Sequence, residues 1–509
     1  MPAPIRSFPG PFRPDSKVDL SGLSAALERQ GFTREALESK GIIGTKSAAE
    51  WDRMNRMLDF KPELRTLIHL FMLAKTLPIA DVNAALGAGL VASLVECGML
   101  HKSPAGAEGL AAEGALLPLS GLFTMGDFSS IETGRTMASD HVPCISPAAT
   151  LVASLSVRVP CDRALDLCCG SGYHALLAAS HAREVVGTDI NDRSLNFAAM
   201  SSRLNALTNI EWRKGSFFEP LEGETFDLID ANPPFVISPA TDLIFRDSGM
   251  LGDKVSETII RRLPSMLREN GWASMLFNWH HKSADDWEDK PRQWLPDSGC
   301  DVWLLRFRSD DPQAYAIGWL RTGLPAGKDP DPARLPEWLA YYKRIGAEVL
   351  SLGAVIIRRR TPASGAAPNW FKADTLPTRD DHPSASDQIQ RVFAGETALR
   401  GPRGDAAVLD LKPRLADGIT LEQTSSQSNG AWKPSVSRLV QTGGITLRCG
   451  LDEALAAVVA RCDGSRTARD AAQSVAKERG LGDGPEAALG AVPILAWLVR
   501  QGFFDLEPA

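Results

Sequence analysis

The residues best suited to chemistry lie in two short segments near the middle of the 509-residue chain. In the first, Asp166-Leu-Cys-Cys-Gly170-Ser-Gly172 follows an apolar run typical of a strand and precedes a helical pattern, YHALLAASHA. Glycine lets a ligand approach the backbone closely, and a helix N-terminus offers N–H groups without partners. The next strand pattern, EVVGTDI, ends at Asp189, where a carboxylate can accept hydrogen bonds from ribose hydroxyls. Together these residues predict a pocket for adenosine.

The second segment, FDLIDANPPF, places Asn232-Pro233-Pro234-Phe235 directly after another predicted strand. The carboxyl ends of the strands form the edge at which doubly wound sheets bind ligands. A plain βα connection is the structural alternative for the glycine turn, and a rigid turn is the alternative for two consecutive prolines. Both motifs occur in order with Asp189 between them, which favours a functional site over these alternatives.

These motifs resemble those of class I S-adenosylmethionine-dependent methyltransferases of the Asn-Pro-Pro-Phe type, which include release-factor glutamine, adenine-N6 and guanine-N2 methyltransferases. The resemblance is strongest from about Asp140 to Trp279. With its helical N- and C-terminal regions, the chain also resembles a group of bacterial multi-domain methyltransferases. The resemblance implies methyl transfer as the reaction and S-adenosyl-L-methionine as the cofactor.

The resemblance also implies which residues contact the cofactor. Those expected at its methionine part, ribose and adenine, in chain order, are Asp166, Cys168, Gly170, Gly172, Asp189, Ile190, Ser216, Phe217 and Asn232. Cys168 replaces the usual first glycine, and Ser216 replaces an acid that often meets the adenine amino group. The thiol of Cys168 is expected to make the site sensitive to thiol reagents. The segment DHVPCISPAATL is expected to cover the pocket.

The Asn-Pro-Pro-Phe segment is implied to activate a planar nitrogen, whose delocalised lone pair makes it a poor nucleophile. The Asn232 side-chain oxygen and the Pro233 carbonyl would accept hydrogen bonds from the acceptor's N–H groups. Pro233 and Pro234 would make the loop rigid, and Phe235 would stack on the acceptor. Three acceptor classes stay open: an amide or amine of a protein or peptide, a small-molecule metabolite or natural product methylated on nitrogen or oxygen, and a nucleobase of RNA or DNA.

Charge and composition favour the first of these classes. The net charge of -7 and the pI of about 5.7 give no overall positive field for phosphate backbones, so nucleic acid is the less favoured partner. The 8 cysteines lack metal-ligand spacing, which predicts no metal site and a reducing compartment. The N-terminus has no apolar signal region and no long apolar run follows, which predicts a cytoplasmic protein without membrane contact. No pattern indicates the oligomeric state.

The length predicts about three domains at ~150 residues each. Residues 121–375 alternate apolar β-branched runs with helical patterns, which predicts a doubly wound α/β sheet of seven strands, a Rossmann-like catalytic domain. Residues 1–120 end in a helix, a glycine turn, a second helix and a strand, which predicts a winged-helix-like α domain. Residues 376–410 are rich in turn formers and predict a linker. Residues 411–509 predict a small α+β domain, also winged-helix-like because LVRQGFF resembles LVECGML.

Two further polar pairs have both a chemical and a structural interpretation. Asp140-His141 is expected to cap a loop rather than to relay a proton. His280-His281 is expected to be solvated in a loop rather than to bind a metal, because no carboxylate or cysteine stands at ligand spacing.

Overall fold

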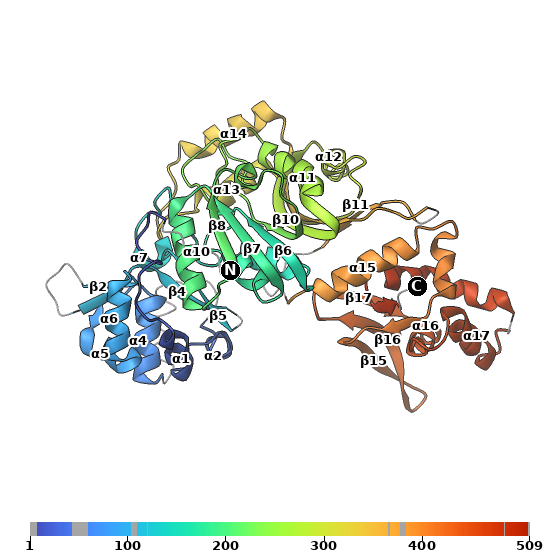
Figure 1. The fold of residues 1–509 in the computed structure, drawn as a ribbon. Coiled ribbons are helices and arrows are strands. Elements are labelled where there is room, and N and C mark those ends of the chain that lie inside the picture. The colour runs from blue at the N-terminus through green and yellow to red at the C-terminus, as the bar shows by residue number, and fades with distance from the viewer. Residues whose placement is uncertain are drawn as a thin grey trace.

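A computed structural model describes residues 8–42, 60–102, 109–119, 121–364, 367–376, 383–482 and 484–506. At its centre is an eight-stranded mixed sheet with the order β13-β11-β12-β10-β9-β6-β7-β8 (Figure 1). The strands of this sheet are β6 (Cys161–Leu167), β7 (Ala182–Asp189), β8 (Ile210–Lys214), β9 (Phe226–Ala231), β10 (Leu267–His281), β11 (Cys300–Asp310), β12 (Val349–Arg359) and β13 (Phe371–Thr375).

The strand order places the two sequence motifs beside each other. Strands β10, β9, β6, β7 and β8 run parallel, and β12 is antiparallel to both of its neighbours. The order of the strands along the chain reverses between β6 and β9, and such a switch point is where doubly wound sheets bind ligands. Leu167 at the end of β6 pairs with Ala231 at the end of β9. The glycine turn and the Asn-Pro-Pro segment therefore start side by side at the carboxyl edge of the sheet.

The predicted Rossmann-like sheet is confirmed, but the predicted number of strands is wrong. The additional strand is β13, which pairs in parallel with β11 from Val302↔Phe371 to Arg306↔Thr375. Its sequence, FKADT, is short and half polar, so it lacks the apolar run that marks the other buried strands.

Helices cover both faces of the sheet. One apolar layer contains residues of α8, α9, α10, α13 and α14, and the other contains residues of α11 and α12. These helices, with one 3-10 turn, are α8 (Pro147–Leu155), α9 (Tyr173–Ala178), α10 (Asp192–Leu204), η1 (Glu219–Leu221), α11 (Lys254–Met266), α12 (Asp289–Trp294), α13 (Pro312–Leu320) and α14 (Arg334–Ile345). Because both faces are covered, the central strands are almost continuously apolar.

The N-terminal part packs on α10 rather than forming a separate core. Phe197, Met200 and Leu204 of α10 belong to the same buried cluster as the N-terminal helices. The predicted boundary after residue 120 falls between β4 and β5, which pair with each other. The elements before the large sheet are α1 (Gly22–Arg29), α2 (Arg34–Ser39), α4 (Pro62–Phe71), β1 (Leu77–Pro78), α5 (Ile79–Leu86), α6 (Ala88–Glu96), β2 (Leu100–Lys102), β3 (Gly109–Ala112), β4 (Ala115–Leu119), β5 (Leu122–Gly126) and α7 (Ser130–Thr133).

The C-terminal part begins within the stretch expected as a linker. Residues 376–410 contain a buried helix, α15, whose Phe393 packs on Trp272 with ring centroids 4.8 Å apart. Helix α15 is therefore packed against the amino end of β10. The C-terminal elements are α15 (Ser386–Ala398), η2 (Gly404–Asp410), β14 (Pro413–Leu415), β15 (Ile419–Ser428), β16 (Ala431–Gln441), β17 (Leu447–Leu451), α16 (Glu453–Ala460), α17 (Ala468–Glu478), η3 (Pro485–Ala491), α18 (Val492–Arg500) and β18 (Phe504–Leu506).

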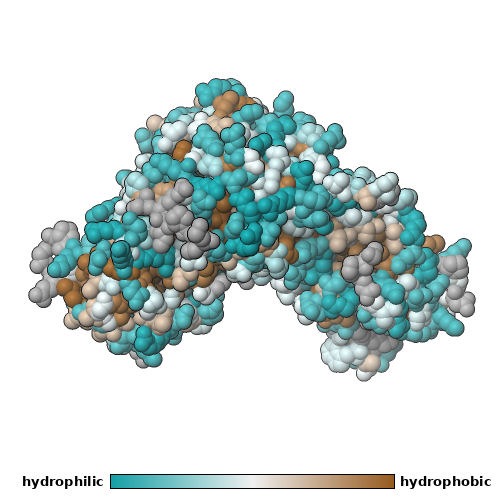
Figure 2. Space-filling model, viewed as in Figure 1, coloured by the Kyte–Doolittle hydropathy of each residue, from teal (hydrophilic) through white to brown (hydrophobic). Residues whose placement is uncertain are grey.

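The N-terminal and C-terminal parts stand apart on either side of the central sheet (Figure 1). On the face drawn in space-filling form, polar residues cover most of the surface and the two parts do not meet (Figure 2). In the described part of the chain, no single helix has the length and apolar character to span a membrane, although α5 and α6 together would qualify as a pair bent by 108°.

Candidate active site

The glycine turn leaves open space beside one glycine and packs tightly at the other. Gly170 has a φ of +52°, and nothing lies within 4 Å of the position that a Cβ would take. Gly172 has a φ of +82°, and a Cβ there would come within 2.7 Å of Trp212. Gly170 therefore borders the space available to a ligand, whereas Gly172 lets the start of α9 pack against β8.

Cys168 adopts the backbone conformation that the family's usual glycine would adopt easily. Its φ is +60°, which is sterically costly for a residue with a Cβ. Burial, together with the charges of Asp189 and Asp166, raises the pKa of the Cys168 thiol well above its usual value. The thiol therefore stays protonated and is a poor nucleophile, which does not support the expected sensitivity to thiol reagents.

Asp189 ends β7 beside the glycine turn. Its Oδ2 accepts a hydrogen bond from Gly170 N at 2.9 Å, and its Oδ1 accepts one from Asn191 N at 2.8 Å. Each oxygen keeps a further lone pair for a ribose hydroxyl. Burial raises the pKa of Asp189 to about 6, although these N–H groups favour the ionised form. The next residue, Ile190, is 57% exposed and offers an apolar surface where an adenine ring is expected.

Ser216 and Phe217 follow β8 at the neighbouring strand end. Gly215 N donates to the carbonyl oxygen of Asp189 at 3.1 Å, so this loop starts next to Asp189. Ser216 N donates to the Glu219 carboxylate at 3.0 Å, and both Ser216 and Phe217 are half-buried. An acid thus lies close to the position where the family often has one, although it comes from three residues later in the chain.

Asn232 is positioned to meet a ligand. It follows β9 directly, it is partly exposed, and its side chain has no hydrogen bond with any residue that the structure describes. Phe235, by contrast, is only 6% exposed and belongs to the apolar layer on the sheet. Only a small part of the Phe235 ring is therefore available for the predicted stacking on an acceptor.

Two buried tyrosines fix the backbone that follows Phe235. Ile237 N donates to the Tyr315 hydroxyl at 3.1 Å, and the Tyr342 hydroxyl donates to the Ile237 carbonyl at 3.0 Å. Val236 N also donates to the Arg246 carbonyl at 3.2 Å. The tyrosine contacts come from α13 and α14, and together with the Arg246 carbonyl they make the Asn-Pro-Pro loop a rigid support. The sequence carried no signal that these tyrosines reach the loop.

Asp166 lies beneath the turn instead of facing the space beside Gly170. It is 1% exposed, its Oδ2 accepts a hydrogen bond from Ala175 N at 2.9 Å, and its Oδ1 lies 3.5 Å from His174 Nδ1. Its carboxylate thus holds the first turn of α9. A direct contact with the methionine part of a cofactor, as the family resemblance implies, stays a prediction.

The segment expected to cover the pocket lies against the glycine turn. Ser171 Oγ donates to the Cys144 carbonyl at 2.8 Å, and Asn191 Nδ2 donates to the Asp140 carbonyl at 2.9 Å. His141 is 6% exposed and its Nδ1 lies 3.8 Å from Asp127. The segment is therefore attached on both sides of the space between Gly170 and Ile190.

The expectation of two solvated histidines in a loop is wrong. His280 and His281 are the last residues of β10 and are 15% and 3% exposed in their side chains. His280 Nε2 lies 3.7 Å from Asp253, and His281 Nε2 lies 2.8 Å from Ser351 Oγ. Burial lowers the pKa of both rings. β10 extends further than its apolar run, because β12 pairs with it as far as His281.

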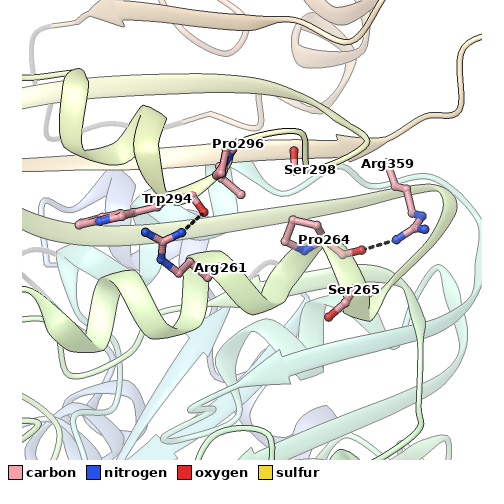
Figure 3. Close-up of a pocket in the computed structure, with 8 residues that line it drawn as sticks. Arg261, Pro264, Ser265, Trp294, Pro296, Ser298 and Arg359 are labelled. Carbon is pink, nitrogen blue, oxygen red and sulfur yellow. Dashed lines mark hydrogen bonds between the residues drawn. The ribbon is translucent and has the colours of Figure 1, made fainter.

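A separate hollow of about 320 Å3 lies at the opposite edge of the sheet (Figure 3). Arg261 donates to the Trp294 carbonyl there, and Arg359 donates to the Pro264 carbonyl. None of the residues that line it belongs to the predicted site. In the described ranges, no group of three or more His, Cys, Asp or Glu side chains is placed to hold a metal ion.

The groups at the carboxyl edge fit an adenosine-containing cofactor. Open space beside Gly170, a carboxylate at Asp189 and an exposed apolar side chain at Ile190 follow one another along this edge. Asn232 lies at the same edge, directly after β9, which neighbours β6 on the side opposite β7.

Comparisons with known proteins agree with this fit. Residues 160–294 match the family described as a methyltransferase domain, and residues 391–505 match a domain of unknown function, DUF7782. The chain is 31% identical over 137 residues to the release factor glutamine methyltransferase of Xylella fastidiosa (strain 9a5c), which covers 24% of this chain and 49% of the relative.

A second relative is the ribosomal protein uL3 glutamine methyltransferase of Xanthomonas campestris pv. campestris, with 37% identity over 123 residues, 21% of this chain and 39% of the relative. The chain thus spans half or less of the length of these curated relatives. A solved ribosomal protein L11 methylase from Lactobacillus delbrueckii subsp. bulgaricus aligns with 42% of this chain and 78% of its own at 20% identity, with a TM-score of 0.25. Residues 160–294 are a methyltransferase domain, and the methyl donor for this domain is S-adenosylmethionine.

Proposed function

We propose that this protein transfers a methyl group to a planar nitrogen, most specifically the side-chain amide of a glutamine in a protein. The observation that carries the proposal is the position of Asn232-Pro233-Pro234 immediately after β9, next to the glycine turn at the switch point of the sheet. The two curated relatives described above are both named as glutamine methyltransferases of protein substrates, which supports an amide acceptor.

S-adenosylmethionine would supply a methyl group bonded to a positively charged sulfur. As the new N–C bond forms, the C–S bond breaks, the sulfur leaves as a neutral thioether, and the methylated nitrogen loses a proton to solvent. The chain's own residues must orient the acceptor nitrogen and free its lone pair. The Asn232 side-chain oxygen and the Pro233 carbonyl accept hydrogen bonds from the N–H groups of the amide, which draws the nitrogen away from planarity. The rigid backbone that Tyr315 and Tyr342 support keeps both acceptors in place, so little reorganisation is needed on binding.

The flanking parts support a macromolecular acceptor. In the N-terminal part, α4, β1, α5, α6, β2 and β3 follow the order of a winged helix, and α5 and α6 meet at 108°. We interpret this part as winged-helix-like. The second helix, AGLVASLVE, contains no Lys or Arg, which favours contact with protein over contact with DNA. In the C-terminal part, α16, α17 and α18 precede β18, which pairs with β14, and we interpret it as a second winged-helix-like unit.

The test separates cofactor binding from transfer. Asn232→Ala is expected to bind S-adenosylmethionine almost as tightly as the wild type and to lose about a hundredfold or more in methyl transfer, as removal of a transition-state hydrogen-bond partner does. Asp189→Ala is expected to lose cofactor binding itself. Calorimetry gives the first quantity, and transfer of a labelled methyl group gives the second. If Asn232→Ala lost cofactor affinity as completely as Asp189→Ala, this division of roles would be wrong.

The acceptor is identified by offering labelled S-adenosylmethionine to glutamine-containing protein, RNA and metabolite pools in parallel. Methylation of glutamine side chains in the protein pool, located by mass spectrometry, supports the proposal. Labelling confined to RNA or to a small molecule would overturn the amide assignment and leave the methyltransferase domain as it is.

A further inference from the structure

Two buried carboxylates lie side by side beneath the glycine turn. Asp166 on β6 and Asp230 on β9 are neighbours in the parallel register, and they are 1% and 4% exposed. Asp230 Oδ2 accepts a hydrogen bond from Ser156 Oγ at 2.7 Å, and its Oδ1 has no hydrogen-bond partner within the described ranges. Two carboxylates this close in a dry interior resist simultaneous ionisation unless a cation accompanies them.

His174 is placed to be that cation. Its ring is 4% exposed, its Nε2 lies 3.1 Å from the Ala149 carbonyl, and its Nδ1 lies 3.5 Å from Asp166 Oδ1. The Ala149 carbonyl accepts a hydrogen bond from a protonated Nε2, whereas Asp166 Oδ1 has no hydrogen-bond partner within the described ranges, so the attraction between the ring and Asp166 is one of charge. Burial disfavours the charged ring, but the interactions with Asp166 and Asp230 outweigh it and raise the pKa of His174.

These contacts join the glycine turn to the segment that covers it. Ala149 belongs to α8, which continues the covering segment from its N-cap, Ser146. Ser171 makes the other attachment through the Cys144 carbonyl. Two contacts thus join the covering segment to the glycine turn and α9: His174 with the Ala149 carbonyl, and Ser171 with the Cys144 carbonyl. Of these two, only the His174 ring can carry a charge.

We propose that protonated His174 is a positioning residue that holds the covering segment against the glycine turn and so sets the affinity for the cofactor. When the ring loses its proton, the attraction to Asp166 disappears and the link between α9 and α8 weakens. A histidine whose folded pKa is raised contributes fully at low pH and loses its contribution as the pH rises through that pKa. Cofactor affinity is thus expected to fall on the alkaline side.

The other groups around the ring do not produce this alkaline fall. Burial raises the pKa of Asp230 to about 6, so this carboxyl titrates on the acidic side. The positive charge of Arg158 acts on Asp230 and lowers its pKa against the effect of burial. Burial raises the pKa of Tyr173, whose ring lies edge-on at 5.4 Å, so its hydroxyl stays neutral. The Asp166 carboxylate completes the surroundings of the ring.

The experiment is calorimetric titration of S-adenosylmethionine into the full chain and into His174→Gln, from about pH 6 to about pH 9.5. Glutamine can still donate to the Ala149 carbonyl but carries no charge. At the acidic end the variant is expected to bind about three- to tenfold more weakly, the difference between a charge-assisted and a neutral hydrogen bond. As the pH rises, the dissociation constant of the wild type should approach that of the variant.

Matched variants make the result specific. His101→Gln, at a half-exposed histidine near Glu113, should follow the wild type at every pH. Ser171→Ala removes the uncharged link and should weaken binding by the same factor at every pH. Asp230→Asn removes one of the carboxylates that raise the pKa of His174. In this variant the alkaline fall in cofactor affinity should therefore occur at a lower pH than in the wild type. This variant also serves if His174→Gln, checked by circular dichroism, does not fold.

A constant ratio between wild type and His174→Gln at every pH would overturn the role of the charge, and equal affinities would overturn the link altogether. If the alkaline fall in cofactor affinity had the same midpoint pH in Asp230→Asn as in the wild type, the role of the His174 charge would also be overturned. The readout is cofactor binding alone, so it does not depend on the identity of the methyl acceptor.

Discussion

Asp189 is expected to make cofactor binding depend on pH, because an ionised carboxylate accepts hydrogen bonds from ribose hydroxyls at both oxygens and more strongly than the protonated group does. Burial raises the pKa of Asp189 to about 6. Only about a tenth of the carboxyl is ionised at pH 5, so the affinity for S-adenosylmethionine should fall about tenfold between pH 7 and pH 5. Calorimetric titration across this range measures the fall, and a flat profile would contradict the expectation.

The same group affects folding stability with the opposite sign. A carboxyl whose folded pKa is raised binds its proton more tightly in the folded state, so its contribution to stability rises as the pH falls from about 6 to about 4. In Asp189→Asn, the acidic loss of cofactor affinity and this gain in stability should both disappear, which denaturant unfolding at each pH can check.

Cys168 offers a test of backbone strain. The φ of Cys168 is +60°, and a left-handed residue with a Cβ costs about 1 kcal/mol. Replacement of Cys168 by glycine should therefore stabilise the protein by about that amount. The control is Cys169→Gly, at a buried neighbour without a positive φ, where glycine should destabilise the protein. Denaturant unfolding measures both, and a less stable Cys168→Gly would contradict the interpretation.

Motif order revealed Asp189 and Asn232 as candidate site residues because each follows a strand at the same edge of the sheet. His174 and Asp230 escaped prediction, because their meeting depends on the register between β6 and β9 and on the angle of α9. Asp230 inside the apolar strand FDLIDA, like Asp166 inside β6, was a visible signal of this network.

Among the elements, β7 and β8 meet through a glycine and a tryptophan. A Cβ at Gly187 would lie 2.2 Å from Trp212, so Gly187→Ala should destabilise the protein by about 1–3 kcal/mol through overpacking. Trp212→Phe should recover part of this loss in the double variant. Gly318→Ala is the control, because that glycine lies in α13 with open space around it and should be stabilised by about 0.5–1 kcal/mol. Equal unfolding midpoints for both alanine variants would refute the packing argument.

At the same scale, apolar periodicity predicted the parallel strands and failed for two other elements. β13 is short and polar, and α15 stands in a stretch whose turn formers predicted a linker. Both are stabilised by partners distant in sequence, β11 for the strand and Trp272 for the helix. Such tertiary contacts leave no local pattern.

In the whole molecule, α10 of the methyltransferase domain contributes Phe197, Met200 and Leu204 to the core of the N-terminal part, whereas most of the C-terminal part has a core of its own. Phe197→Ala, which removes a ring packed 4.8 Å from that of Phe12, should cost about 3–5 kcal/mol and loosen both the N-terminal part and α10. Leu495→Ala, equally buried, should cost about 2–5 kcal/mol and loosen the C-terminal core alone. Hydrogen exchange with mass spectrometry resolves the two patterns, and the same pattern in both variants would show a single cooperative unit.

The hairpin of β15 and β16 has a consequence for how molecules of this protein meet one another. β15 is the edge of its sheet and is exposed from Thr420 to Gln427, and Trp432 near the hairpin's tip is 74% exposed. An unpaired edge is a template for a strand from a second molecule. Glu422 and the bulge between Thr424 and Ser425 oppose such pairing. Because Glu422 and the bulge oppose this pairing, two molecules are expected to meet at this hairpin only weakly and at high concentration, through an arm of the C-terminal part that contributes no residue to the candidate site.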